Sequence, residues 1–106
     1  MQDFKINSAF KLHNGVEMPC LGLGVFKAQD GDEVVNAVQG AIDTGYRHID
    51  TAAIYRNEKG VGKGIKNSGI DRKNIFLTSK VWNADQGYDS TIKALQTSLG
   101  KLGTDY

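Results

Sequence analysis

The sequence lacks several features that would point to a secreted, membrane-bound or nucleic-acid-binding protein. Its one cysteine, Cys20, cannot form an intramolecular disulfide, which favours a reducing compartment. No apolar run approaches the roughly 18 residues of a membrane helix. The polar start at residues 1–5 also lacks the apolar core of a signal peptide. We therefore expect a soluble, cytoplasmic protein with no membrane partner.

Charge is also not biased toward one sign, with 13 basic and 12 acidic residues and a net charge of +1. Basic residues form no run and do not alternate with aromatic ones, so the sequence predicts no nucleic-acid partner. The 106 residues, 40% of them hydrophobic, suffice for one domain or for part of one. We expect no second domain.

The chain is expected to open with a β-hairpin over about residues 9–18. Two short strand-like runs flank Asn14-Gly15, a dipeptide that favours a tight hairpin turn. Pro19 should end the pairing of the hairpin strands. Residues 20–24 should then form the first buried strand, with Cys20 as a small buried side chain.

Three amphipathic helices are expected, one after each of three strands. Hydrophobic residues recur at three- and four-residue steps over residues 34–42, after a capping-box pattern at residues 30–33. Asn57 should cap a shorter second helix. Ser90 should cap the third helix, whose apolar face consists of Ile92, Leu95, Leu99 and Leu102.

Glycines at positions 60, 62 and 64 give the second helix a superficial likeness to a phosphate-binding loop. The segment follows a loop and not a strand, lacks the Gly-Lys-Ser/Thr ending, and has the wrong spacing for a dinucleotide fingerprint. Gly22 and Gly24 in the first strand also lack a third glycine. Close packing or backbone clearance is therefore favoured over nucleotide binding at both places.

Charged residues stand where the second and third strands end. Residues 46–49 form a strand that leads to Asp50, and the strand-like run at residues 75–79 leads to Lys80. The thirty residues from Asp50 to Lys80 match one strand-helix-strand unit, so both side chains should meet at the same end of a parallel sheet. Strand ends recurring about every thirty residues favour either a barrel of eight such units or an open doubly wound sheet.

Tyr55, five residues after Asp50, completes a candidate chain for proton transfer. The Lys80 ammonium would stabilise the phenolate of Tyr55 and lower its pKa, and Asp50 would keep Lys80 charged. Such a phenol suits protonation of the alkoxide that forms when a hydride reaches a carbonyl carbon. From the residues alone, two alternatives stay open: a structural ion pair with a packed tyrosine, or Lys80 as a Schiff-base lysine.

His48 shares a strand face with Asp50 and could in principle begin a metal site. Two ligands without a third fall short of such a site, so a hydrogen-bonded interior histidine is favoured and no metal is predicted.

Together these stretches resemble the aldo-keto reductase family, in particular its bacterial members that reduce glyoxal and methylglyoxal. The likeness runs from about Lys11 to Tyr106 and is most specific at residues 11–19, 22–26, 45–52, 55–58 and 78–82. It implies a TIM (β/α)8 barrel, of which residues 1–106 carry the N-terminal hairpin and the first three βα units. It also implies NADPH, bound without a Rossmann domain, and a small-molecule carbonyl substrate.

The resemblance assigns roles to single residues. The family's catalytic tetrad is Asp, Tyr, Lys and His, and Asp50, Tyr55 and Lys80 match the first three, with Tyr55 as the general acid. The same likeness implies that the cofactor contacts Gly24, Val25 and Asp50, and that the substrate pocket is lined by Phe26 and Trp82.

The tetrad histidine, which in the family closes the fourth strand, is missing, and Phe26 stands where many relatives carry tryptophan. We therefore expect a truncated reductase of about three-eighths of a barrel, inactive and prone to self-association, whereas the full-length protein would be a monomer. The alternative is a non-catalytic aldo-keto-reductase-like binding or structural subunit.

Overall fold

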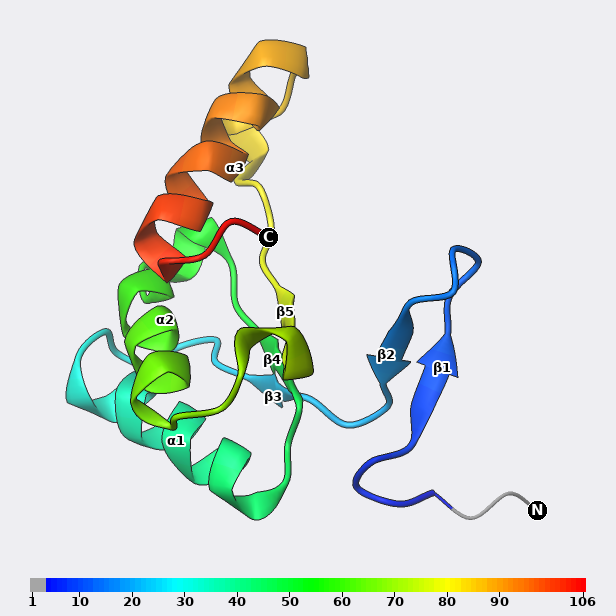
Figure 1. The fold of residues 1–106 in the computed structure, drawn as a ribbon. Helices are drawn as coiled ribbons and strands as arrows, with labels where there is room; N and C mark the ends of the chain where they lie inside the picture. Colours follow the sequence, from blue (N-terminus) through cyan, green and yellow to red (C-terminus); the bar gives the residue numbers. More distant parts are fainter. Residues whose placement is uncertain (1–3) are drawn as a thin grey trace.

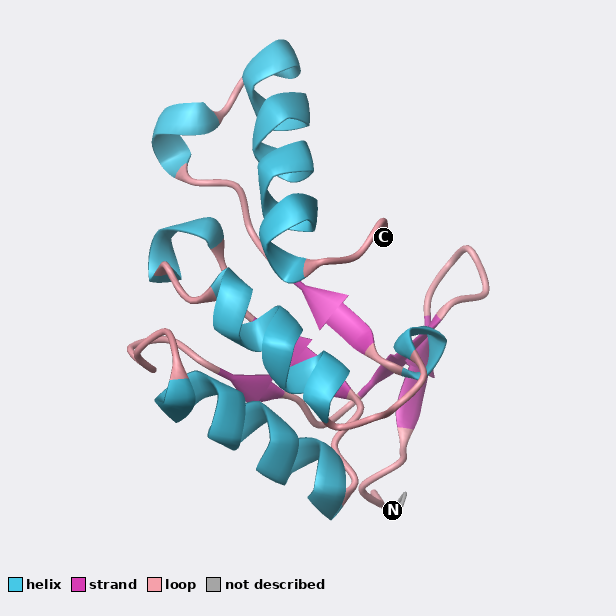
Figure 2. Ribbon diagram, turned by 60° about the vertical axis from the view of Figure 1, so that its left-hand side comes forward, coloured by secondary structure: helices cyan, strands magenta, loops and turns pink. Residues whose placement is uncertain are grey.

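The computed structural model describes residues 4–106, so residues 1–3 of the expected polar start lie outside the described range. A two-stranded hairpin lies beside an open three-stranded sheet, and three helices lie together on one side of that sheet (Figures 1 and 2). The strands are β1 Ala9–Lys11, β2 Glu17–Pro19, β3 Leu23–Gly24, β4 His48–Asp50 and β5 Phe76–Thr78. The helices are α1 Asp32–Thr44, α2 Glu58–Asn67 and α3 Tyr88–Leu102, with short 3₁₀ turns at Ala53–Tyr55, Arg72–Asn74 and Asn83–Asp85.

The hairpin forms where the Asn14-Gly15 dipeptide predicts it, with Phe10 opposite Met18. Gly15 adopts a left-handed φ of 87°, which explains the glycine at this turn. Pro19 pairs opposite Ala9 and is the last residue of β2, so the strand ends at the proline as expected, although one hydrogen bond follows it. The expectation that Cys20 is a buried strand residue is wrong. Its N–H donates to the Ser8 carbonyl in an extension of the hairpin, and its side chain is exposed.

The three-stranded sheet is parallel, in the order β3-β4-β5. Gly24 lies opposite Asp50, and Asp50 lies opposite Thr78. Hydrogen bonds continue past these strand ends, from Val25 N–H to the Asp50 carbonyl at 3.1 Å and from Thr51 N–H to the Thr78 carbonyl at 2.8 Å. The sheet is therefore shorter than expected from the sequence. It has the predicted parallel direction, but the residue level with Asp50 is Thr78, so Lys80 lies two residues further along the chain.

The core lies between the sheet and the helices. Helix α1 buries the face that its three- and four-residue steps predict, and it ends at Gly45, which adopts a left-handed φ of 117°. Ile49 of the central strand β4 is fully buried beneath it. The core cluster consists of Val25, Val34, Val38, Ile42, Ile49, Val61, Ile65, Ile75 and Leu102. Within residues 4–106, no helix combines the length and apolar character needed to cross a membrane.

The predicted side-chain caps of the helices are wrong, because the polar side chains at the helix starts bind elsewhere. The Asp30 carboxylate does not cap α1 but accepts from the Gly60 N–H in α2, at 2.8 Å. Asn57 precedes α2 as expected, yet its side chain makes no capping bond and is buried in the core. Helix α3 begins at Tyr88, so Ser90 lies within its first turn and does not precede it.

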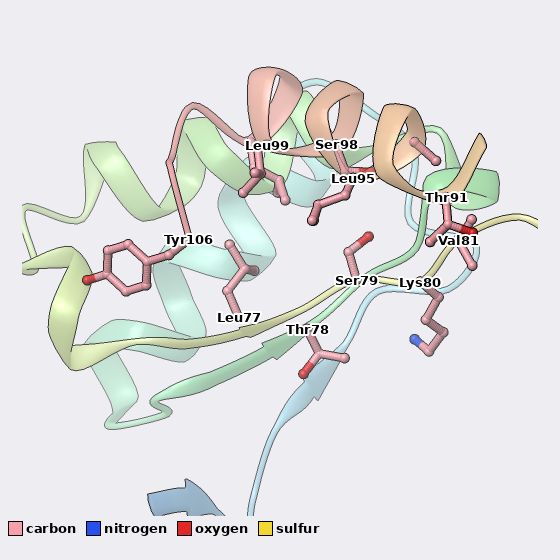
Figure 3. Close-up of a pocket in the computed structure, with 12 residues that line it drawn as sticks. Leu77, Thr78, Ser79, Lys80, Val81, Thr91, Leu95, Ser98, Leu99 and Tyr106 are labelled. Carbon is pink, nitrogen blue, oxygen red and sulfur yellow. The ribbon is translucent and has the colours of Figure 1, made fainter. Parts of the chain in front are cut away.

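Helix α3 is only partly covered. Leu102, at its C-terminal end, is buried against α2, whereas Ile92 and Leu95 of the same apolar face are 44% and 58% exposed. A largely apolar cavity of about 500 Å³ separates this face from strand β5 (Figure 3). Its apolar lining residues are Leu77, Val81, Ala94, Leu95, Leu99, Leu102 and Tyr106.

The glycines of α2 allow close helix packing, as the sequence suggests. A Cβ at Gly60 would overlap Val34, and a Cβ at Gly64 would lie 2.8 Å from Val38 Cβ, both in α1. A Cβ at Gly62 would overlap the Leu102 carbonyl of α3. Helix α2 is thus held between its two neighbours at van der Waals distance.

We predict that Gly62→Ala destabilises the protein by about 2 kcal/mol, because α3 must move away to admit the new methyl group. Gly40→Ala in α1 is the control, since a Cβ there meets nothing within 4 Å. The control should stabilise by about 0.5–1 kcal/mol through helix propensity. Chemical denaturation measures both changes, and equal effects at the two positions would contradict the packing argument.

Candidate functional site

The candidate site lies at the C-terminal edge of the parallel sheet, where the residues that follow β4 and β5 emerge side by side. The Asp50 carboxylate and the Lys80 ammonium form an ion pair, which confirms the contact predicted from the strand spacing. Lys80 Nζ also donates to the Thr51 carbonyl at 3.0 Å. The backbone reinforces this arrangement, since the Ala53 N–H donates to the Lys80 carbonyl at 3.1 Å.

The ion pair holds Lys80 in its charged form. Partial burial by itself lowers the pKa of the Lys80 ammonium, whereas the hydrogen bond and the negative charge of Asp50 raise it. The nearby Tyr55 oxygen adds to this effect, and the net result is a Lys80 pKa raised above the ordinary lysine value. The side chains of Lys80 and Asp50 remain 48% and 39% exposed, so a ligand can reach both of them.

Tyr55 ends the 3₁₀ turn Ala53–Tyr55 and stands over the ion pair. Lys80 Nζ lies 5.2 Å from the centroid of the Tyr55 ring. The same ring contacts Phe26, with ring centroids 5.2 Å apart and planes tilted by 51°. The structure therefore brings together Asp50, Lys80, Tyr55 and Phe26, while a close approach of the Tyr55 hydroxyl to Lys80, with the ammonium as donor, stays a prediction.

Two buried polar residues at the start of α2 tie the loops of the site together. Asn57 Nδ2 donates to the carbonyls of Val25 and Ala28, both at 3.0 Å, and its Oδ1 accepts from Thr51 Oγ1 at 2.6 Å. Glu58, 2% exposed, accepts from Ser79 Oγ at 2.8 Å. An acidic residue such as Glu58 is well placed in the first turn of α2, because the N-terminal end of the helix dipole carries a partial positive charge.

Sequence reasoning missed these two roles. Asn57 was expected only as a helix cap, and Glu58 was given no function. The available signal was the run of polar residues at 56–58, at the start of a helix of low propensity, where loop-anchoring side chains are found. The distant partners of these side chains could not be recognised from local spacing.

The residues expected to contact the cofactor differ in accessibility. Gly24 is exposed beside Asp50, and a Cβ built on it meets nothing within 4 Å, so a flat ligand can approach its backbone. A cofactor carrying ribose hydroxyls fits this edge, since the Asp50 carboxylate can accept hydrogen bonds from them. The Val25 side chain is buried in the core, so any contact with a cofactor would involve its main chain.

The two residues expected to line the substrate pocket lie in different surroundings. Phe26 is 66% exposed and packs against Tyr55. Trp82 is 41% exposed and lines a separate cavity of about 380 Å³, together with Ile54 and residues of α3. The cavity beside Trp82 does not include Phe26, so a substrate pocket shared by the two residues stays a prediction.

His48 is hydrogen-bonded, as the sequence favours, but it is half-buried and not fully interior. Its Nε2 lies 2.9 Å from Thr78 Oγ1, and its ring meets Phe76 edge-on at 4.9 Å between centroids. In the described part of the chain, no three His, Cys, Asp or Glu side chains form a group that could hold a metal ion.

Comparison with known sequences places the chain among reductases. The sequence model described as the Aldo/keto reductase family matches residues 20–106. The chain is 58% identical over 101 residues to a glyoxal reductase of Bacillus subtilis, and 48% identical over 99 residues to a methylglyoxal reductase of Escherichia coli. These alignments cover 95% and 93% of this chain, but only 37% and 35% of the two relatives.

Solved structures agree with the sequence comparison. An aldo/keto reductase from Brucella melitensis matches with a TM-score of 0.89 at 60% identity, and one from Bombyx mori, solved in complex with NADP, with a TM-score of 0.82 at 41%. Each match covers 93% of this chain and 38% or 35% of the other chain. Residues 4–106 therefore have the arrangement of part of a TIM barrel, and the chain spans somewhat more than a third of its relatives' length.

We predict that Asp50→Asn lowers the pKa of Lys80, because the negative charge is lost while partial burial remains. NMR titration of the Lys80 side chain measures the change. Asp71→Asn is the control. Within residues 4–106, Asp71 forms an ion pair only with the exposed Lys73, at 3.7 Å, so its removal should leave the pKa of Lys80 unchanged.

The raised pKa also fixes the direction of the pH dependence. A lysine stabilises the fold when its pKa is higher in the folded state than in the unfolded state, where it is about 10.4. This stabilisation is complete below the unfolded-state pKa and is lost as the pH rises through the folded-state pKa. The stability difference between the unchanged chain and Asp50→Asn should therefore persist at neutral pH and shrink above about pH 10.4. A difference that grows in this range would contradict the assignment.

Proposed function

The chain belongs to the aldo/keto reductase family of oxidoreductases, and on this basis we propose that, within a complete barrel, its residues help to reduce an aldehyde or ketone such as glyoxal or methylglyoxal with NADPH. The observation that carries the proposal is the Asp50–Lys80 ion pair beside Tyr55 at the C-terminal edge of the sheet. Barrels of this type hold their chemistry at that edge.

Tyr55 is the proposed general acid. When bound, NADPH supplies the hydride that reaches the carbonyl carbon. The Tyr55 hydroxyl donates its proton to the carbonyl oxygen as negative charge develops there. The Lys80 ammonium stabilises the phenolate that remains, and Asp50 keeps Lys80 charged and in place. Each role follows from an ordinary property of the group at its observed position.

Cofactor and substrate are proposed to meet above the strand ends. Gly24, with open space over its backbone, and the exposed Asp50 carboxylate would face the ribose and nicotinamide, with Val25 contributing main-chain contacts. The Bombyx mori relative solved with NADP supports the choice of cofactor. Phe26, packed on Tyr55, would form one wall of the substrate pocket, and Trp82 a more distant one.

The test needs a complete barrel. We define the chimeric barrel as the Bacillus subtilis glyoxal reductase in which residues 1–106 of this chain replace the corresponding segment, a substitution that the 58% identity favours. Reduction of methylglyoxal by the chimeric barrel, followed by NADPH consumption, is the expected result. A folded chimeric barrel that binds NADPH but reduces no aldehyde or ketone would favour the non-catalytic alternative.

In the chimeric barrel, we predict that Tyr55→Phe lowers kcat about a hundredfold or more, because the proton donor is removed. Binding of NADPH, measured by fluorescence titration, should change little. Tyr88→Phe is the control, since Tyr88 is 85% exposed at the start of α3, and it should keep full activity. Full activity of Tyr55→Phe together with weakened NADPH binding would show that Tyr55 contacts the cofactor and is not the acid.

The 106-residue chain by itself should neither bind NADPH tightly nor reduce aldehydes at a useful rate. Its three parallel strands leave β5 at an open sheet edge, and the apolar face of α3 next to it is exposed. Parallel sheets are normally covered on both faces, so we expect copies of the chain to associate. Analytical ultracentrifugation and an NADPH titration measure both properties. A monodisperse monomer that binds NADPH at micromolar concentration would refute this expectation.

A further inference from the structure

We propose that Asn57 is a positioning residue which, together with Asp30, clamps the loop after β3 onto the first turn of α2 and thereby sets the place of Phe26 against Tyr55. The proposal rests on the carbonyl reduction proposed above, because it assigns the clamp a role in substrate binding.

The Asn57 amide is built into the loop. Its side chain is fully buried, and both Nδ2 hydrogens are used, one on the Val25 carbonyl and one on the Ala28 carbonyl. The Thr51 hydroxyl donates to Oδ1, which leaves the amide one orientation. A flipped amide would point its oxygen at two carbonyl oxygens, which repel it. One side chain thus holds two backbone carbonyls of the loop, three residues apart.

The loop that Asn57 holds is strained. The Ala28 N–H donates to the Val25 carbonyl at 3.0 Å and closes a tight turn, in which Lys27 has a left-handed φ of 68°. Arg56, directly after Tyr55, has a left-handed φ of 58°. Such conformations are unfavourable for residues with a side chain and persist where the surroundings hold them. Each of the two contacting rings, Phe26 and Tyr55, is followed by one such residue.

Asp30 provides the second attachment of the loop. Its Oδ1 accepts from the Gly60 N–H at 2.8 Å, so it satisfies a free donor of the first turn of α2. Gly60 leaves room for this contact, because a Cβ there would lie 2.5 Å from Asp30 Oδ1. The loop is therefore attached to α2 at both of its ends, by Asn57 near β3 and by Asp30 near α1.

The clamp matters because burial does not hold Phe26. That side chain is 66% exposed, so the position of its ring follows from the loop. Releasing the loop would move Phe26 away from Tyr55 while the Asp50–Lys80 pair, held by β4 and β5, stays in place. Substrate binding should then weaken with little effect on proton transfer, which raises KM more than it lowers kcat.

The test compares variants in the chimeric barrel. Asn57→Ala should raise KM for methylglyoxal about fivefold or more with kcat changed less than about twofold. Hydrogen exchange of the Ala28 amide should accelerate at least about tenfold in the same variant, a readout that requires no activity. Ile42→Val weakens the core near the C-terminal end of α1, the end opposite to the one that the loop enters. It should lower the unfolding temperature and leave both KM and Ala28 exchange unchanged.

Asp30 supplies a milder pair of variants in case Asn57→Ala does not fold. Asp30→Ala removes the acceptor for Gly60 and should raise KM, whereas Asp30→Asn keeps an oxygen there and should restore the original value. A folded Asn57→Ala with unchanged KM overturns the proposal, whether or not Ala28 exchange changes. If Asn57→Ala does not fold, equal KM values for the two Asp30 variants overturn it.

The two proposals fail separately. An unsubstituted chimeric barrel without activity would refute the proposed function, and the exchange of Ala28 in Asn57→Ala would still show whether the clamp holds the loop. An active chimeric barrel whose KM does not respond to the Asn57 and Asp30 variants would refute the positioning role alone.

Discussion

The register of three short parallel strands determines where the Asp50–Lys80 ion pair of the candidate site lies. Because Gly24, Asp50 and Thr78 lie level with one another, the residues that follow them leave the sheet at one edge. A slip of one residue would turn Asp50 to the opposite face of the sheet. His48 opposes such a slip. Its ring is hydrogen-bonded to Thr78 in β5, and it also lies close to Gly22, where an added Cβ would be only 3.0 Å from the ring. The half-buried His48 thus helps to align the strands that carry the ion pair.

The parts of the fold that could be predicted from the sequence depend on local or periodic patterns. The thirty-residue spacing is a property of strand-helix-strand units, so the contact between Asp50 and Lys80 followed from topology without any knowledge of side-chain conformation. The apolar face of α1 and the glycine after it likewise depend on helix geometry alone. The family resemblance at residues 45–52 and 78–82 pointed to the same strand ends, and the family comparisons agree with it.

The parts that could not be predicted depend on contacts between distant residues. Asp30 and Asn57 carry side chains that commonly cap helices, but here their partners lie about thirty residues away in the sequence. A local pattern can show that a helix begins there; it cannot show that a better hydrogen-bond partner lies across the fold. Cys20 was misplaced for a similar reason, because the hairpin extends to it through Ser8. The uncovered face of α3 depends on what packs against it, which no periodicity within α3 reveals.

The three glycines of α2 bear on the order in which the molecule can assemble. A ten-residue segment with glycine at three positions has little tendency to be helical in isolation, since each glycine disfavours the helix by up to about 1 kcal/mol relative to alanine. The free energy that makes α2 helical therefore comes from contacts with α1 on one side and Leu102 of α3 on the other. Helix α2 can become ordered only as its neighbours dock, so the loop that carries Tyr55 and ends at the first turn of α2 becomes ordered in the same late step of folding.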